Sequence, residues 1–297
     1  MNTPDSRKKE KILAAAAAAG TLLLWSSAFA AIRVGLSGYD PVRLAVLRFL
    51  CASAALLLPA LFGKFPLPRA KDLPMILFLG FSGIVMYHVP LNMGEMTVPA
   101  GTASLLVSVA PVFTALVAVA FLGERLPFLG WTGILLSFAG AVLLALEGGG
   151  GFSLSAGALW ILLAAASESF YFALQKKLLG IYGPLKLTAY VIWGGTAFLL
   201  PFAGGLAGAV ASAPLEATLA AVYLGAGPAA TAYVLWSFAL SRYPASQMAA
   251  VLYLSPVLAI LIAWFWLGEL PGLPALAGGA VVVAGVILVQ KAFSKAI

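Results

Sequence analysis

Long apolar runs alternate with short polar connections along nearly the whole chain. A run of about 17 to 25 residues is long enough to cross the hydrocarbon core of a bilayer as an α-helix. No polar stretch between the runs has room for a soluble domain. The pattern therefore predicts ten transmembrane helices, at residues 12–36, 41–62, 73–96, 99–122, 128–146, 154–178, 184–206, 214–240, 244–267 and 271–291.

Composition places these helices in lipid. Of the 297 residues, 63% are hydrophobic and 9% are charged, and the mean hydropathy is +1.05. A soluble domain of this length could not bury so much apolar surface. The sequence thus predicts an all-α integral membrane protein.

Basic residues divide unevenly between alternate connections. With a cytoplasmic amino terminus, fourteen of the 17 Lys and Arg lie on the cytoplasmic side, and only Arg33, Arg43 and Arg48 lie on the other. This bias satisfies the positive-inside rule and predicts a multi-pass protein of the bacterial inner membrane with both termini in the cytoplasm. The net charge of +7 then reflects topology, and no nucleic-acid partner is expected.

The first apolar run also resembles a secretory signal. A basic stretch at residues 7–11 precedes it, and residues 28–30 read Ala-Phe-Ala, as at a cleavage site. Against cleavage, Ser26 has a counterpart in Ser167 of the sixth run, so removal of the first run would leave one repeat short of a helix. We expect this run to be retained.

An internal repeat organises the chain. Pro111-Val112 and, after an apolar stretch, Leu122-Gly123-Glu124 recur 145 positions later as Pro256-Val257 and Leu267-Gly268-Glu269. The same offset places two further pairs in register: Leu79-Gly80 on Leu224-Gly225 and Pro99-Ala100 on Pro244-Ala245. Several consecutive helices therefore repeat together, which a shared apolar composition would not produce.

Each repeat holds five crossings, with the first at residues 1–148 and the second at 149–297. An odd number forces the second copy to enter the membrane from the opposite side, so the repeats are expected to be inverted. Inverted repeats around a central cavity suit a carrier that opens alternately to either side.

These repeated segments resemble the drug/metabolite transporter superfamily, whose ten-helix members contain the EamA-type domain twice. The resemblance covers nearly the whole chain and is greatest to the aromatic amino-acid exporter group. It implies export of amino acids, aromatic ones included, or of similar small amphiphilic metabolites across the inner membrane. The superfamily also contains carriers of drugs, nucleotide-sugars and phosphorylated metabolites, which stay as alternatives.

Polar residues inside the predicted helices are the candidate substrate site, because such residues rarely face lipid. His88 and Asn92 lie one turn apart in the third run, and Glu168 is the deepest acid of the chain. An apolar wall with a few polar points suits a small amphiphile. The predicted substrate-binding residues are His88, Glu168, Asn92, Tyr87, Trp25, Tyr171, Trp236, Tyr233 and Tyr253.

Each of these residues also has a structural interpretation. His88 and Glu168 could bond to neighbouring helices, and any single aromatic residue could belong to packing or to an interfacial belt. Glu95 lies at a helix end, where ordinary solvation is expected. Arg48 is the only basic residue well inside a predicted span, and it could extend outward or bind a carboxylate.

Prolines and repeated glutamates complete the set of candidate residues. Pro111 and Pro256 lie mid-helix, where each removes a backbone donor, and Pro90 and Pro228 do the same in the third and eighth runs. We expect bends at all four, which either shape the packing or act as gates. Glu124 and Glu269 are expected to be structural helix-end anchors.

Other function classes fit poorly. Gly80-Phe81-Ser82-Gly83 resembles the motif of an intramembrane serine protease, but His88 lies about 240° around the same helix from Ser82, so the two cannot form a dyad. No phosphate-binding loop for ATP is present. The single cysteine, Cys51, gives neither an internal disulfide nor a metal cluster.

The protein is therefore expected to be a secondary transporter and not an enzyme. A purely structural membrane protein is the remaining alternative, in which a buried histidine and glutamate would be superfluous. The expected partners are a small-molecule substrate, membrane lipid and protons. No cofactor, metal or protein partner is required.

Overall fold

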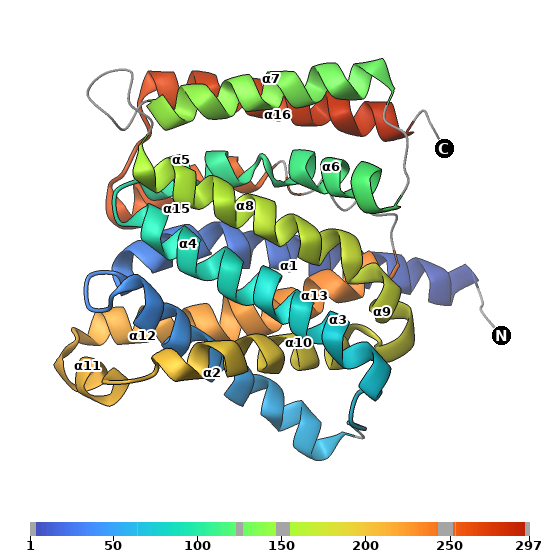
Figure 1. Cartoon of the computed structure of the whole chain (residues 1–297), viewed down its shortest axis with the longest axis vertical. Helices are drawn as coiled ribbons and strands as arrows, with labels where there is room; N and C mark the ends of the chain where they lie inside the picture. Colours follow the sequence, from blue (N-terminus) through green and yellow to red (C-terminus); the bar gives the residue numbers. More distant parts are fainter. Residues whose placement is uncertain are drawn as a thin grey trace.

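The computed structural model is built from helices laid across the molecule in one general direction (Figure 1). It describes residues 4–63, 65–122, 127–146, 155–242, 252 and 254–294, and no strand occurs among them. In the first half the helices are α1 (Pro4–Gly35), α2 (Pro41–Phe62), η1 (Ala70–Asp72), α3 (Leu73–Gly80), η2 (Phe81–Val85), α4 (Met86–Glu95), α5 (Ala100–Val107), α6 (Ala110–Leu122) and α7 (Phe128–Leu146).

In its described residues the second half follows the same order, with α9 and α11 as additional short helices. Its helices are α8 (Ala156–Leu174), α9 (Lys176–Tyr182), α10 (Pro184–Leu199), η3 (Leu200–Phe202), α11 (Leu206–Ser212), α12 (Leu215–Leu224), η4 (Gly225–Thr231), α13 (Ala232–Leu240), α15 (Ser255–Leu267) and α16 (Leu273–Ser294). The segments η2 and η4 are π-helical, whereas η1 and η3 are 3-10 turns.

The ten expected crossings are confirmed. Among the described residues, six helical stretches are long and apolar enough to cross a membrane, and four shorter apolar helices occupy the other expected positions. The seventh crossing ends earlier than expected, at Phe202, because the chain turns there and forms α11. The expected division between the repeats, at residues 148 and 149, lies outside the described residues and stays a prediction.

Local sequence signals explain where several helices begin. The Asp40 carboxylate accepts hydrogen bonds from the backbone N–H groups of Val42 and Arg43, and Pro41 occupies the first turn of α2. A side-chain acceptor before the helix and a proline in its first turn favour initiation at this point. Ser155 caps α8 in the same way, accepting from the N–H of Ala158.

The contact between α7 and α16 shows the inverted symmetry of the halves. A Cβ on Gly133 would lie 2.7 Å from the carbonyl oxygen of Gly285, and one on Gly140 would lie 2.8 Å from that of Gly278. The helices are therefore antiparallel, and the repeat offset of 145 exchanges one contact with the other. Between them the hydroxyl of Ser137 donates to the Val282 carbonyl at 3.1 Å, and these two residues are themselves 145 positions apart. A two-fold axis relating the halves passes through this pair.

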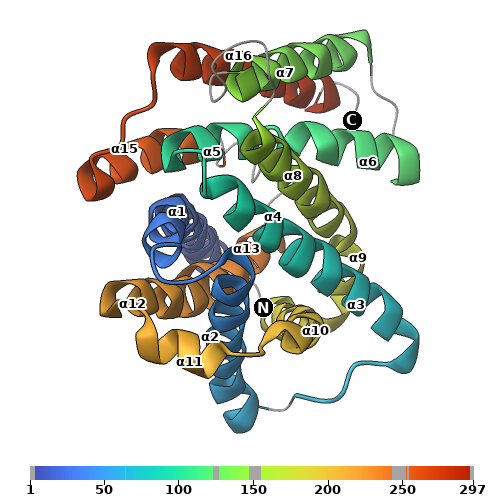
Figure 2. The same ribbon diagram turned by 60° about the vertical axis from the view of Figure 1, so that its left-hand side comes forward.

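The halves interlock across the same axis. Helix α1 packs on α12, α13 and α15 of the second half, and α8 packs on α4, α5 and α6 of the first. Figure 2 shows α7 and α16 together at one end of the molecule, with α5, α6 and α15 in the layer next to them. Neither half forms a separate body.

The fourth crossing is broken, and the ninth has a turn at the equivalent position. Helix α5 ends at Val107 and α6 begins at Ala110, while α15 begins at Ser255 after a turn at Leu254. Pro111 and Pro256 thus lie in the first turns of α6 and α15, where a proline is tolerated, and not in the middle of a continuous helix.

The third and eighth crossings contain the two other prolines at which bends are expected. Pro90 lies within the regular helix α4, and Pro228 lies inside η4. The irregularity that both crossings share is a π-helical segment directly after Gly80 and Gly225, which are repeat equivalents. Both glycines pack on backbone of the other half, Gly80 on α10 and Gly225 on α2, whereas Pro90 and Pro228 are not repeat equivalents.

Candidate functional site

Aromatic rings from α1, α8 and α13 meet at the centre of the interlocked halves. Trp25 lies with its ring centroid 5.2 Å from that of Trp236 and 5.5 Å from that of Tyr233. Tyr171 and Phe172 of α8 extend the group, at 5.6 Å from Tyr233 and from Trp236 respectively. Tilted and edge-on contacts of this kind stabilise an aromatic cluster beyond simple burial.

His88 joins this aromatic cluster at the two-fold axis. Its Nε2 lies 3.2 Å from the hydroxyl oxygen of Tyr233, within hydrogen-bond distance. The two residues are 145 positions apart, so they are repeat equivalents that meet on the axis. The rings of Phe49 and Tyr87 flank the imidazole at 4.7 and 4.6 Å.

The π-helical segments supply carbonyl acceptors to the same rings. The Tyr233 hydroxyl donates to the Gly83 carbonyl at 3.4 Å, and the Trp25 indole N–H donates to the Pro228 carbonyl at 3.1 Å. Gly83 and Pro228 are again repeat equivalents, and each accepts from a side chain of the other half. A π-helical turn leaves backbone carbonyls outside the regular α-helical ladder, and such turns occur often at functional sites.

Three charged side chains are buried around the aromatic cluster. Glu168 is 5% exposed, Arg48 2% and Glu95 0%. Glu95 is not solvated at its helix end, contrary to expectation, because α4 is covered there by its neighbours. Both of its carboxylate oxygens are buried without a hydrogen-bond partner among the described residues. A charge inside a bilayer costs about 2.5–3.5 kcal/mol on insertion scales, so these groups point to a specific use.

Asn92 holds α4 against the start of α2. Its amide donates to the Pro41 carbonyl at 2.9 Å. The equivalent residue of the other half, Ser237, lies 3.2 Å from the Thr188 hydroxyl. Asn92 lies one helical turn after His88, but its side chain contacts the start of α2 and not the aromatic cluster.

One end of the molecule is closed by a cluster around Glu269. Its carboxylate accepts from the backbone N–H of Ala100, the first residue of α5, at 3.1 Å and lies 3.3 Å from the Arg33 guanidinium. Arg33 also donates to the Glu95 carbonyl at 2.6 Å. The carboxylate occupies the positive end of the α5 dipole and joins the ends of α1, α4 and α5 to the end of α15.

Two residues with predicted roles have no described position. Glu124, the repeat equivalent of Glu269, and Tyr253 of the substrate-binding set lie outside the described residues. Their predicted roles stay untested.

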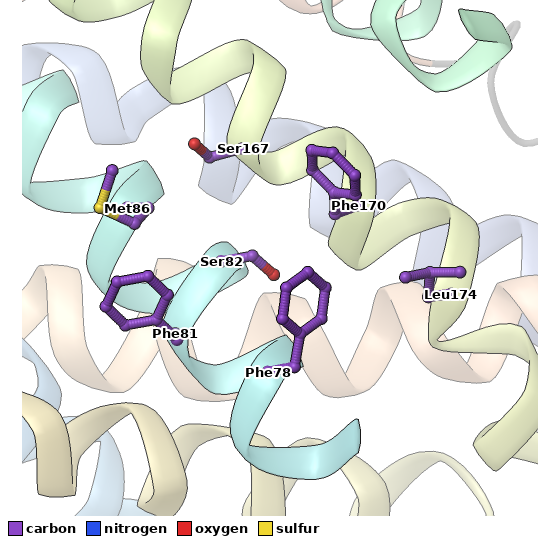
Figure 3. A pocket seen from close by; sticks show the side chains of 7 residues that line it. All are labelled: Phe78, Phe81, Ser82, Met86, Ser167, Phe170 and Leu174. Atoms are coloured by element: carbon purple, nitrogen blue, oxygen red, sulfur yellow. The ribbon is translucent and has the colours of Figure 1, made fainter. Parts of the chain in front are cut away.

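A groove of about 480 Å³ lies between the third crossing and α8, on the outer side of both helices (Figure 3). It is lined by Phe78, Phe81, Ser82, Met86, Ser167, Phe170 and Leu174. At the centre, by contrast, the rings of Tyr171 and Tyr233 are 1% and 2% exposed, so the aromatic cluster is packed shut in this conformation.

The structure adds Phe49, which the sequence did not single out. It carries an ordinary apolar side chain, and nothing in its spacing distinguishes it from a lipid-facing residue. Arg48 had a signal, since it is the only basic residue deep in a span, but its orientation depends on how α2 packs.

Comparison with known proteins decides the family. The model of the EamA-like transporter family matches residues 12–146 and again residues 155–290. The chain belongs to the EamA-like transporter family. The two matches also bear out the expected resemblance to the drug/metabolite transporters.

Individual EamA-like relatives extend over almost the whole chain. It is 46% identical over 273 residues to the uncharacterized transporter YdfC of Bacillus subtilis, covering 92% of this chain and 89% of the relative. It is 44% identical to a probable terminal-alkyne amino-acid exporter of Streptantibioticus cattleyicolor, with 91% of each covered. It is 26% identical to a probable amino-acid metabolite efflux pump of Salmonella typhimurium, with 90% and 91% covered.

A solved crystal structure supports the same fold. It matches with a TM-score of 0.65 at 22% sequence identity, covering 95% of this chain and 98% of the other. Family, relatives and helices agree that the protein is a multi-pass membrane transporter. The family and these relatives carry the names of transporters.

Proposed function

We propose that this EamA-like protein exports amino acids, including aromatic ones, or similar small amphiphilic metabolites by alternating access. The carrier lies in the bacterial inner membrane with both termini in the cytoplasm, and its inverted repeats span residues 1–148 and 149–297. Transport is secondary, with protons as the candidate coupling ion.

The contact between His88 and Tyr233 is the observation that carries this proposal. Because the two residues are repeat equivalents on the two-fold axis, a site built around them keeps its place when the halves exchange conformations. Inverted-repeat carriers use such a fixed central site, opened first to one side and then to the other.

The chemistry of the aromatic cluster favours an amine with an apolar side chain. The faces of Trp25, Trp236 and Tyr233 provide apolar walls that also attract a cation. The Glu168 carboxylate, which is buried beside the aromatic cluster, is a suitable counter-ion for a substrate ammonium or a proton. The indole N–H of Trp236 and Nδ1 of His88 are also buried and unpaired within the described part of the chain.

The named relatives support an amino-acid substrate. One carries the name of a terminal-alkyne amino-acid exporter and another that of an amino-acid metabolite efflux pump. A nucleotide-sugar or phosphate carrier needs several cations around the phosphate groups. Among the described residues, Arg48 is the only Lys or Arg that is buried near the aromatic cluster.

Counterflow in proteoliposomes tests the proposal directly. Vesicles that contain the purified protein are preloaded with unlabelled phenylalanine, leucine or propargylglycine, and uptake of the same compound in labelled form is followed. We expect at least one of these amino acids to exchange well above protein-free vesicles. Replacement of Glu168 by Gln should lower exchange about tenfold or more, since a charge-assisted contact contributes about 1.5–3 kcal/mol.

Glu216→Gln is the matched control, because Glu216 is an exposed glutamate in the first turn of α12. It should exchange substrate like the wild type. Absence of exchange for every amino acid in the wild type would contradict an amino-acid carrier. Accumulation driven by a pH gradient in the wild type and lost in Glu168→Gln would assign the proton to this carboxylate.

A further inference from the structure

Arg48 is fixed deep inside the molecule by the packing of α2. The residue lies seven positions after Pro41, the first residue of this 22-residue helix, and is 2% exposed. A Cβ on Gly225 would meet the Arg48 carbonyl oxygen and the Cys51 side chain, so the backbones of α2 and η4 touch at this point. Arg48 is therefore held in the packed interior, where its side chain is almost completely buried.

Two nitrogen atoms of the guanidinium have no hydrogen-bond partner among the described residues. Its Nε and Nη1 atoms are buried and make no hydrogen bond to any described group. Arg33 and Arg43, by contrast, pair with Glu269 and Asp40. A buried arginine keeps its charge, so these two free donors favour the approach of an anion.

Arg48 faces the aromatic cluster. Its guanidinium carbon lies 5.5 Å from the ring centroid of Phe49, which contacts His88 in turn. Glu168 and Glu95 both interact electrostatically with the guanidinium, although neither forms an ion pair with it. A cation and a carboxylate thus border one site from α2 and α8 without neutralising each other directly.

We propose that Arg48 binds the carboxylate of the transported amino acid and so selects for a free acid group. The inference rests on the proposed amino-acid function and deepens it. The planar guanidinium matches a carboxylate with two parallel hydrogen bonds, given either by Nε and Nη2 or by Nη1 and Nη2, and the unpaired Nε and Nη1 each supply one donor of such a pair. Glu168 then faces the ammonium, and the aromatic rings enclose the side chain.

This arrangement distinguishes an amino acid from amines that share its side chain. A methyl ester keeps the ammonium and the apolar part but presents no anion to Arg48. The corresponding amine lacks the carboxyl group altogether. The unpaired guanidinium therefore rejects both compounds, because each leaves a buried charge unmatched.

Competition in counterflow measures this preference. Uptake of labelled phenylalanine is measured in the presence of one unlabelled competitor at a time: the free amino acid, its methyl ester, or the corresponding amine without the carboxyl group. The same series is run with labelled propargylglycine. The wild type should prefer the free acid about 10- to 100-fold. In Arg48→Gln the free acid should lose affinity by a similar factor, while affinity for the methyl ester changes little, so that the preference disappears.

Arg43→Gln is the matched control, since Arg43 lies five positions earlier in the same helix, is half-exposed and pairs with Asp40. Its preference should equal that of the wild type. Arg48→Lys, which keeps the charge but not the planar donor pair, should fall between wild type and Arg48→Gln. Elution as a single species in detergent establishes that each variant folds.

The possible outcomes separate the two proposals. If the wild type exchanges amino acids but accepts the methyl ester as well as the free acid, the assignment of Arg48 is overturned without any variant. The same holds if Arg48→Gln keeps the wild-type preference. If the wild type exchanges no amino acid, the proposed function fails and the assignment fails with it.

Discussion

Three buried polar residues of this transporter border one region, although they come from different helices. His88, Glu168 and Arg48 belong to α4, α8 and α2, yet all border the aromatic cluster. Their repeat equivalents differ in chemistry, as His88 meets Tyr233 across the axis. The scaffold is symmetric, whereas the side chains presented to a substrate are not.

The bond between His88 and Tyr233 should contribute to stability as a coupled pair. His88→Phe and Tyr233→Phe keep a ring in place but remove the polar contact. A double-mutant cycle on detergent unfolding should give a coupling energy of about 0.5–1.5 kcal/mol. The control cycle combines His88→Phe with Tyr223→Phe, because the Tyr223 hydroxyl bonds to Ser27 instead; its two effects on unfolding should be additive. Additive effects of His88→Phe and Tyr233→Phe would show that the contact between these two residues does not stabilise the protein.

At the level of elements, irregular helices surround the site in symmetric pairs. The π-helical segments η2 and η4 present carbonyls to the aromatic rings, and the turns before α6 and α15 interrupt two further crossings. Serines of the opposite half reach the backbone just after these turns. Ser169 donates to the Ala110 carbonyl at 3.0 Å, and Ser26 to the Ser255 carbonyl at 3.2 Å.

Gating by Pro111 and Pro256 remains a hypothesis that substitution can test. An alanine at either position restores a backbone donor, which favours a continuous helix across the turn. We expect each substitution to slow counterflow about tenfold, equal to about 1.4 kcal/mol in the barrier, without loss of folded protein. Pro59→Ala, inside α2, should exchange normally, and wild-type rates in both test variants would end the gating hypothesis.

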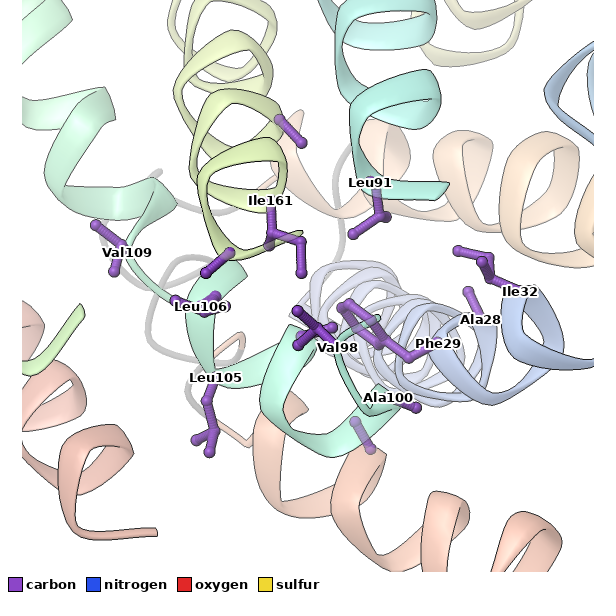
Figure 4. Packing of buried hydrophobic residues seen from close by; sticks show 14 of the residues in the cluster. Ala28, Phe29, Ile32, Leu91, Val98, Ala100, Leu105, Leu106, Val109 and Ile161 are labelled. Carbon is purple, nitrogen blue, oxygen red and sulfur yellow. The ribbon is translucent and has the colours of Figure 1, made fainter. Parts of the chain in front are cut away.

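For the whole molecule, one end is closed in this conformation. Figure 4 shows Phe29 and Ile32 of α1 packed with Val98, Leu91 and Ile161 from the surrounding segments. The Arg33 and Glu269 side chains lie at the same end. In the proposed orientation this is the periplasmic end, so this closed state prevents substrate from passing between the central site and the periplasm.

Loss of the Arg33 contacts should open this end more often. In a Cys51→Ser background, a cysteine in place of Val98, which is 5% exposed, reports access to a water-soluble maleimide. Arg33→Gln should raise its labelling rate about two- to tenfold, in line with a partly exposed ion pair of about 0.5–1.4 kcal/mol.

Two controls accompany this measurement. A cysteine at the exposed Thr97 should react equally fast with and without Arg33, and Arg43→Gln should leave labelling at position 98 unchanged. Equal labelling of Val98→Cys in both backgrounds would show that the Arg33 contacts do not hold this end closed.

The sequence by itself determined the crossings, the inverted repeat and the family. Run length, loop charge and a fixed offset are properties of the chain in one dimension, so they can be read without knowing how helices rotate or pack. Tertiary structure decided which polar groups meet. Glu95 is buried instead of solvated and Arg48 faces the aromatic cluster, because the surroundings of a side chain depend on which helices pack around it, as α2 packs on η4 at Gly225.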